Sequence, residues 1–147
     1  MKNSPSLSAS QARAKMKSVV EGLHAIWNSG DLEAIPDIYS TDFVVHWSKS
    51  AKVPDSHGHA GVKAVIEETR TAFPDWHENV VDMVIEGDRV VTRYISTGTH
   101  KGPFEGIPPT GKPIEIDEIS IYRIEGGKIA EQWCMADDLA LLNQLKS

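Results

Sequence analysis

The spacing of apolar residues changes once along the chain, from a helical period to an alternating one, at about Trp76. Before this point apolar residues recur every three or four positions, as in amphipathic helices. After it they alternate with polar residues, as in strands that have one buried face. Helices first and long strands afterwards predict an α+β fold, in which a curved antiparallel sheet is wrapped by N-terminal helices. Such a cone-shaped sheet can enclose a pocket.

Local signals place the elements of this fold. Ser8 and Gln11 form a capping box at the start of the first helix, and Gly30 ends that helix. The segments Glu86-Gly87-Asp88 and Glu125-Gly126-Gly127 predict tight turns between strands. We expect helices over residues 12–27, 32–39 and 62–73, strands over 42–47, 79–85, 89–97, 114–124 and 128–136, loops over 48–61 and 100–113, and a short helix or turn over 139–145.

The length and charge of the chain limit its possible partners. Its 147 residues fit a single domain, expected over residues 1–147 with a flexible tail over residues 1–8. The net charge of −6 and the lack of a clustered basic stretch argue against nucleic acid and against an anionic membrane surface. No apolar run approaches the ~20 residues of a membrane helix. The single cysteine, Cys134, and the absence of a signal-peptide pattern predict a cytoplasmic protein.

Two of the predicted strands carry apolar residues on both faces, over residues 90–95 and 114–124. In the second of these, alternation places Glu118, Ser120 and Tyr122 on one face and Ile119 and Ile121 on the other. One face can line the pocket, and the other then needs a partner, which predicts a homodimer. The acid-bearing face could equally belong to an edge strand or to the dimer contact, with solvated acids.

Several segments resemble the SnoaL-like family of polyketide (ester) cyclases, part of the nuclear-transport-factor-two-like cone superfamily. These segments are AFPDWH at residues 72–77, GIPPTGK at 106–112 and RIEGGKI at 123–129. The resemblance implies a cone with a small-molecule pocket and ring closure by intramolecular aldol condensation, without a metal or an organic cofactor. It also implies one catalytic aspartate near the end of the last strand. Counted from the shared segments, that position holds Cys134.

Five residues are therefore candidates for proton transfer. Cys134 could act as a thiolate, or could simply be a small buried filler. Glu118 lies in the middle of an apolar strand, where a pocket would explain an acid. Asp137 could be a displaced base or the cap of the last helix. His46 and His59 could hold or move protons near neutral pH, or could be hydrogen-bonded wall residues.

Aromatic and polar residues near these candidates predict a pocket for a flat, ring-containing ligand. His57 and His59 have no third metal ligand at a fixed spacing, so we expect no metal site. The expected ligand-binding residues are Trp47, Trp76, Phe104, Ser120, Tyr122, Gln132 and Trp133.

Two functions are compatible with these features. The first is an enzyme that moves protons on a polyketide-like or other aromatic carbonyl compound, by cyclisation, isomerisation or a related reaction. The second is a non-catalytic binding module that kept the pocket and lost the family's aspartate, which Cys134 replaces.

Overall fold

The computed structural model describes residues 7–147, so most of the tail expected over residues 1–8 lies outside the described residues. Four α-helices and two short 3-10 helices surround one six-stranded sheet in this part of the chain. The helices are α1 (Ala9–Ser29), η1 (Leu32–Ala34), α2 (Ile35–Ile38), η2 (Lys49–Ala51), α3 (Gly58–Ala72) and α4 (Asp138–Lys146). The strands are β1 (Tyr39–His46), β2 (Ser56–His57), β3 (His77–Glu86), β4 (Arg89–Thr99), β5 (Pro113–Glu125) and β6 (Lys128–Ala136).

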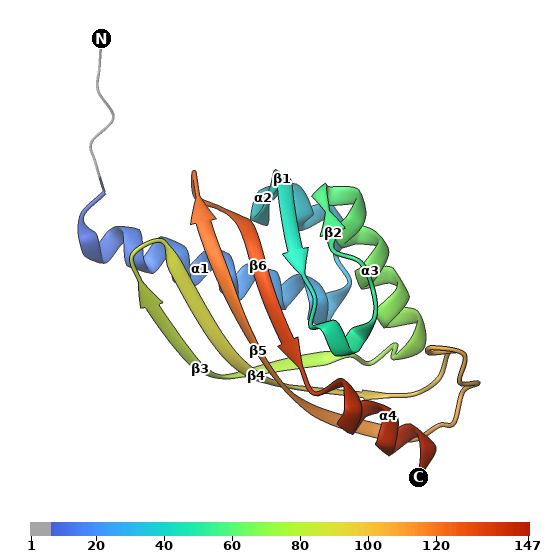
Figure 1. The fold of residues 1–147 in the computed structure, drawn as a ribbon. Coiled ribbons are helices and arrows are strands. Elements are labelled where there is room, and N and C mark those ends of the chain that lie inside the picture. Colours follow the sequence, from blue (N-terminus) through green and yellow to red (C-terminus); the bar gives the residue numbers. More distant parts are fainter. Residues whose placement is uncertain (1–6) are drawn as a thin grey trace.

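The sheet is curved and open, and its strands lie in the order β2-β1-β6-β5-β4-β3 (Figure 1). Strands β3 to β6 form an antiparallel meander, as the alternating pattern predicts. The predicted fold class is confirmed, and the sheet departs from the expected antiparallel arrangement at one place, where β1 runs parallel to β6. Alternation determines which face a side chain takes but not the direction of a strand, so the sequence carries no signal for this pairing.

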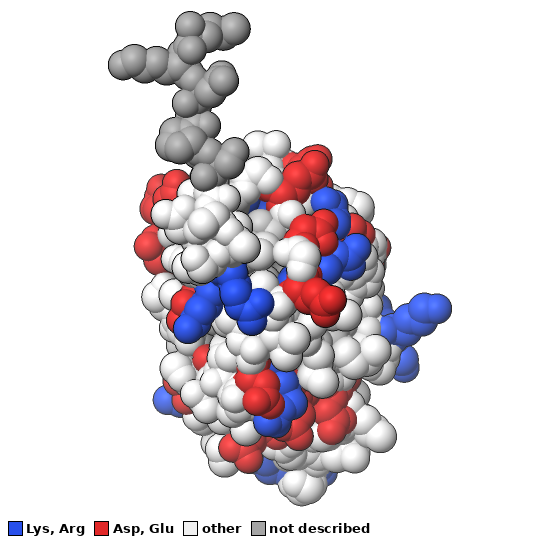
Figure 2. All heavy atoms as spheres, turned by 90° about the vertical axis from the view of Figure 1, so that its left-hand side faces the viewer, with Lys and Arg blue, Asp and Glu red and all other residues white. Residues whose placement is uncertain are grey.

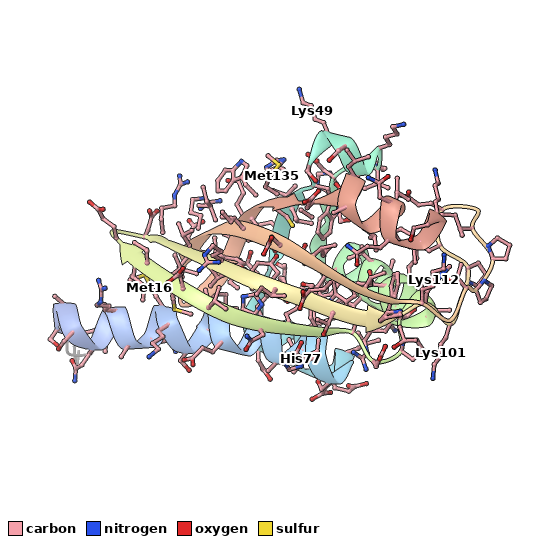
Figure 3. All side chains as sticks on the ribbon, turned by 90° about the horizontal axis from the view of Figure 1, so that it is seen from below. Met16, Lys49, His77, Lys101, Lys112 and Met135 are labelled. Carbon is pink, nitrogen blue, oxygen red and sulfur yellow. The ribbon has the colours of Figure 1, made fainter. Side chains whose placement is uncertain are left out.

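Helices α1 and α3 pack against the sheet. The capping box of Ser8 and Gln11 begins α1 as predicted, and Gly30 ends it with a left-handed backbone. Helix α1 packs against β3 and α3 against β1. Figure 3 shows α1 beneath the sheet, with Met16 on that side and Met135 on the opposite, outer side. Among residues 7–147, no helix is both long and apolar enough to cross a bilayer.

Two local predictions need correction. The loop expected over residues 48–61 contains η2, the short strand β2 and the start of α3. Strand β2 pairs only two residues with β1, and glycines at both 58 and 61 obscure the first turn of α3 in the sequence. The second helix was expected to reach Tyr39, but α2 ends at Ile38, because Tyr39 has an extended backbone and begins β1.

The loop between β4 and β5 is fastened to the end of α3. The backbone N–H of Gly102 donates to the carbonyl oxygen of Ala72, at 3.1 Å. A Cβ at Gly102 would lie 2.2 Å from the carbonyl oxygen of Thr71, so only glycine permits this approach. The loop thereby holds Phe104 and Glu105 at the rim of the cavity described below.

Candidate functional site

A cavity lies between the inner face of the sheet, the helices and the β4–β5 loop. Its volume is about 180 Å³. Five aromatic side chains dominate its wall, which suits a flat, apolar ligand. They come from α1, the segment after β1, the end of α3, the segment before β3, and the β4–β5 loop: Trp27, Trp47, Phe73, Trp76 and Phe104.

The three tryptophans of this wall present ring surface rather than hydrogen-bond donors. Each indole Nε1–H is already bonded to another part of the protein, so the rings contribute apolar contact and fixed orientation. The acceptors are the Tyr39 hydroxyl for Trp27 (3.2 Å), the Ser56 hydroxyl for Trp47 (3.0 Å) and Glu78 Oε2 for Trp76 (3.0 Å).

Glu118 of β5 is the buried acid of the cavity wall, with only 8% of its surface exposed. The Ser96 hydroxyl of β4 donates to its Oε2, and Cys134 Sγ of β6 lies 3.7 Å from its Oε1. Burial, followed by the negative charge of Glu78, raises the pKa of Glu118 to about 8. The Glu118 carboxyl is therefore mostly protonated at neutral pH and can donate or accept a proton there.

Cys134 also lies on the cavity wall and is buried. Burial, together with the charge of Glu118, raises the pKa of its thiol well above the ordinary value. The thiol lies 3.8 Å from the hydroxyl of Tyr94. In this setting Cys134 is a neutral thiol and not a thiolate base.

Behind the wall, the inner face of the sheet carries a buried hydroxyl network. As alternation predicts, Ser120 and Tyr122 share the face of Glu118. Ser120 Oγ lies 2.9 Å from the Tyr94 hydroxyl and accepts a hydrogen bond from Gln132 Nε2 at 3.1 Å. Ser120, Tyr122 and Gln132, all expected to bind ligand, thus lie one layer behind the cavity lining.

Four of the other candidates lie away from the cavity lining. Asp137 caps α4, accepting from the backbone N–H of Ala140 at 3.1 Å. His59 Nε2 donates to the carbonyl oxygen of Tyr39 at 2.7 Å. His46 and Trp133 lie in stacked contact at 5.6 Å, towards the outer side of the sheet.

His46 is held there by two acids. Its Nδ1 lies 2.7 Å from Asp55 and its Nε2 lies 2.7 Å from Glu131. The hydrogen bond to Glu131, above all, raises the pKa of His46. His46 therefore links the segment before β2 to β6 and does not contact the cavity.

The remaining charges of the lining were not singled out in the sequence. Glu68 of α3 and Asp138 of α4 join Glu105 and Glu118, and the described lining holds no Lys, Arg or His. Nothing in their local patterns marks Glu68 or Asp138, since both also fit exposed helix positions. Among the described residues, no three His, Cys, Asp or Glu side chains gather in a metal-binding arrangement.

A buried acid–histidine pair was not predicted from the sequence. His24 of α1 and Glu78 of β3 are both buried, and His24 Nδ1 lies 2.8 Å from Glu78 Oε1. A signal was present for His24, which follows Val20 by four residues in the apolar stripe of the first helix. A polar residue in such a stripe needs a buried partner.

An α+β cone with one aromatic cavity and a buried carboxyl on its wall is the architecture of a small-molecule-binding protein. The sequence model of the SnoaL-like polyketide cyclase family matches residues 17–145. The chain belongs to this family, and the resemblance found in the sequence is confirmed.

Solved structures agree with this membership. IdmH of Streptomyces antibioticus, a proposed polyketide cyclase, shares 34% identity over 90% of this chain and 99% of its own, with a TM-score of 0.79. AclR of Streptomyces galilaeus, a proposed hydroxylase, shares 30% identity over 90% and 82%, with a TM-score of 0.78. TsrD of Streptomyces laurentii shares 29% over 95% and 98%, with a TM-score of 0.80. A search of curated proteins found no significant match.

The raised pKa of Glu118 predicts a pH-dependent cost to stability. In the unfolded chain this carboxyl ionises near its ordinary pKa of 4.5, whereas in the folded protein it ionises near 8. The free energy of unfolding therefore decreases as pH rises from about 4.5 to about 8, and Glu118 makes no further contribution to its pH dependence above that range. Glu118→Gln removes this loss. The melting temperature of the variant, relative to that of the wild type, should therefore increase as pH rises from 5 to 8.

Thermal unfolding followed by circular dichroism at several pH values measures this gain. Glu68→Gln is the matched control, because it neutralises an exposed acid of the same lining and should keep the pH dependence of the wild type. A difference in melting temperature between Glu118→Gln and wild type that stays constant from pH 5 to 8 would contradict the raised pKa of Glu118.

Proposed function

We propose that the protein catalyses cofactor-independent proton transfer on an uncharged aromatic carbonyl compound of polyketide type, with Glu118 as the proton carrier. The observation that carries this proposal is the position of the Glu118 carboxyl, buried on the wall of an aromatic cavity beside Cys134. Membership of a cyclase family supports ring closure as the reaction. Isomerisation or a related proton transfer would use the same groups.

The raised pKa suits Glu118 to both halves of such a reaction. An ionised carboxylate with a pKa of about 8 is a stronger base than an ordinary glutamate, and the fraction ionised at neutral pH is still useful. It takes a proton from the carbon next to a carbonyl, and the enolate carbon forms a bond to a second carbonyl carbon of the same molecule. The alkoxide oxygen then receives the proton back from Glu118. The product is an isomer of the substrate, so no oxidant or cofactor is consumed.

The charges of the lining limit the substrate. Glu68, Glu105 and Asp138 add negative charge around Glu118, and the described lining has no cationic side chain. The tryptophan N–H groups are bonded elsewhere. A carboxylate ligand would thus meet repulsion and few donors, whereas a neutral ester or ketone needs only the proton of Glu118.

A non-catalytic binding module is the second candidate. Its specific support is Cys134, a buried neutral thiol at the position where the family's aspartate is expected. Such a module would use the aromatic wall to hold the ligand, and Glu118 only to donate a hydrogen bond to it.

Substitution of Glu118 separates these candidates. Glu118→Gln keeps the shape and a hydrogen-bond donor but cannot carry the proton, so turnover should fall about a hundredfold or more. Turnover is followed by NMR with a neutral aromatic β-keto ester that carries a second ketone. Exchange of the acidic C–H is measured in deuterated water, and conversion to an isomer of equal mass in ordinary water.

Asp137→Asn is the matched control and tests the other acid that the sequence offered. Since Asp137 caps α4 outside the cavity, this variant should lose some stability but keep its turnover when folded. Turnover that survives Glu118→Gln but not Asp137→Asn would contradict our assignment. Ligands that bind wild type without exchange or conversion would favour the binding module.

We also propose that two copies of the chain associate through the outer face of the sheet. Ile119 and Met135 are neighbours there, 46% and 66% exposed, and Ile121 is 37% exposed. Contiguous exposed apolar residues on a sheet mark a contact surface. Asp117 and Arg93, the latter already paired with Asp82, border the patch, so charged residues surround its apolar centre.

A charge placed in this patch should prevent association. The double variant Ile119→Glu, Met135→Glu should sediment as a monomer at concentrations where wild type is a dimer. Leu7→Glu, which charges an exposed apolar residue next to α1, is the control and should leave the dimer intact. A monomeric wild type in sedimentation equilibrium would refute the proposed contact.

The other expectations from composition stay predictions: a cytoplasmic location and no binding to nucleic acid or membrane. On the face shown in Figure 2, the Lys and Arg side chains lie interspersed with Asp and Glu and with uncharged surface. That distribution supports the expectation about nucleic acid, which a continuous basic surface would oppose.

A further inference from the structure

The pair of His24 and Glu78 lies directly behind the aromatic wall of the cavity. Both side chains are almost completely buried, with 5% and 6% of their side-chain surface exposed. Glu78 Oε1 lies 2.8 Å from His24 Nδ1, and Glu78 Oε2 accepts the indole N–H of Trp76 at 3.0 Å. Because a buried carboxyl is costly without hydrogen-bond partners, these two donors stabilise Glu78 in this position.

The backbone of Glu78 is fixed as firmly as its side chain. Its N–H donates to Asn28 Oδ1 at 2.6 Å, and its carbonyl oxygen accepts from Asn28 Nδ2 at 3.1 Å. Helix α1 thus holds Glu78 through both His24 and Asn28. The carboxylate cannot move away without breaking several buried hydrogen bonds.

The His24 ring is hydrogen-bonded on both of its sides. With the proton on Nδ1 donated to Glu78, Nε2 is free to accept from Thr92 Oγ1 or from the Tyr122 hydroxyl, each at 3.1 Å. These two hydroxyls also bond each other at 2.8 Å, so one of them can donate to the ring. Both ring nitrogens of His24 therefore have a partner, Glu78 on one side and the two hydroxyls on the other.

Contacts lead from this pair to Glu118. The His24 ring meets the Tyr94 ring edge-on, with centroids 4.7 Å apart. The Tyr94 hydroxyl lies 3.8 Å from Cys134 Sγ, which in turn lies 3.7 Å from Glu118 Oε1. Two carboxylates in one low-dielectric interior oppose each other's ionisation, and Glu78 has the stronger donors.

We propose that Glu78, held by His24, is a positioning residue of the candidate site: its buried carboxyl acts on the Glu118 carboxyl, to which it is linked by the contacts through His24, Tyr94 and Cys134, and its hydrogen bond orients the Trp76 ring. The second role follows because Trp76 lines the cavity while its N–H is bonded to Glu78. The proposal rests on the proposed function in giving Glu118 the proton to carry. The predicted effect on Glu118 itself needs no substrate.

Other charged or titratable groups also face Glu118, and the test must separate them from Glu78. The charge of Glu78 is the second cause, after burial, of the raised pKa of Glu118, and the charge of Asp138 acts in the same direction. The titratable groups near the Glu118 carboxyl are Tyr94 on β4, Cys134 on β6, Asp138 on α4, Glu68 on α3 and Glu105 on the β4–β5 loop. Those near Glu78 are His24 on α1 and Tyr122 on β5.

A carbon-13 NMR titration of glutamate side-chain carboxyls, without ligand, measures the effect directly. The Glu118 signal is assigned by its loss in Glu118→Gln. In Glu78→Gln the pKa of Glu118 should fall by roughly one unit or more, since one buried like charge is gone. Glu78→Asp keeps the charge and should restore most of the wild-type value. Glu68→Gln, which removes an exposed acid of the lining, should leave it unchanged.

A second variant covers a failure of Glu78→Gln to fold. His24→Gln combined with Glu78→Gln also removes the charge, and the two amides can bond each other, so the same fall is expected. An unchanged pKa of Glu118 in a folded variant without the Glu78 charge would overturn the proposal. That result would not contradict the proposed function. The proposed function is tested separately, by the turnover of Glu118→Gln.

Discussion

The burial of one carboxyl, Glu118, against an aromatic cavity is the constraint around which the rest of this structure is arranged. A carboxylate in an apolar wall is costly. In this protein Glu118 has Ser96 and Cys134 as neighbours instead of a cation, and it stays protonated at neutral pH. The absence of a counter-ion among the described lining residues keeps that proton available. The chemistry we propose uses this property of the wall.

The fold provides the setting for this carboxyl in two ways. The curvature of the sheet leaves a hollow on its inner face, which α1, α3 and the β4–β5 loop surround without filling. The close contact of Gly102 with the end of α3 fixes the loop that carries Phe104. The outer face of the same strands keeps Ile119 and Met135 at the surface. Alternation along β5 thus places the Glu118 carboxyl on one face of the sheet and exposed apolar residues on the other.

Much of this arrangement could be predicted from the sequence, because periodicity reports burial. The helical stripe of α1 with its capping box, the bounds of β6 and the shared face of Glu118, Ser120 and Tyr122 all follow from local patterns. The parallel pairing of β1 with β6 does not, because it depends on a contact distant in sequence. Strand β2 is two residues long, which is too short to leave a periodic signal.

The site was predictable in part, for a similar reason. Glu118, Cys134 and three of the aromatic residues line the cavity as predicted. They could be placed there because local patterns indicated the strands and loops that carry them. His46 and His59 are bonded to groups brought near by folding, Glu131 and the Tyr39 carbonyl, which no local pattern reveals. The His24–Glu78 pair joins two elements 54 residues apart. Only a polar residue in an apolar stripe marked it.

The central claim is that Glu118 enters its chemistry as a buried, protonated carboxyl. Infrared difference spectroscopy between wild type and Glu118→Gln tests this most directly, because a protonated carboxyl and a carboxylate absorb at different frequencies. We expect the band of a protonated carboxyl at pH 6, which gives way to that of a carboxylate as pH rises through about 8. A carboxylate band already complete at pH 6 would contradict the account.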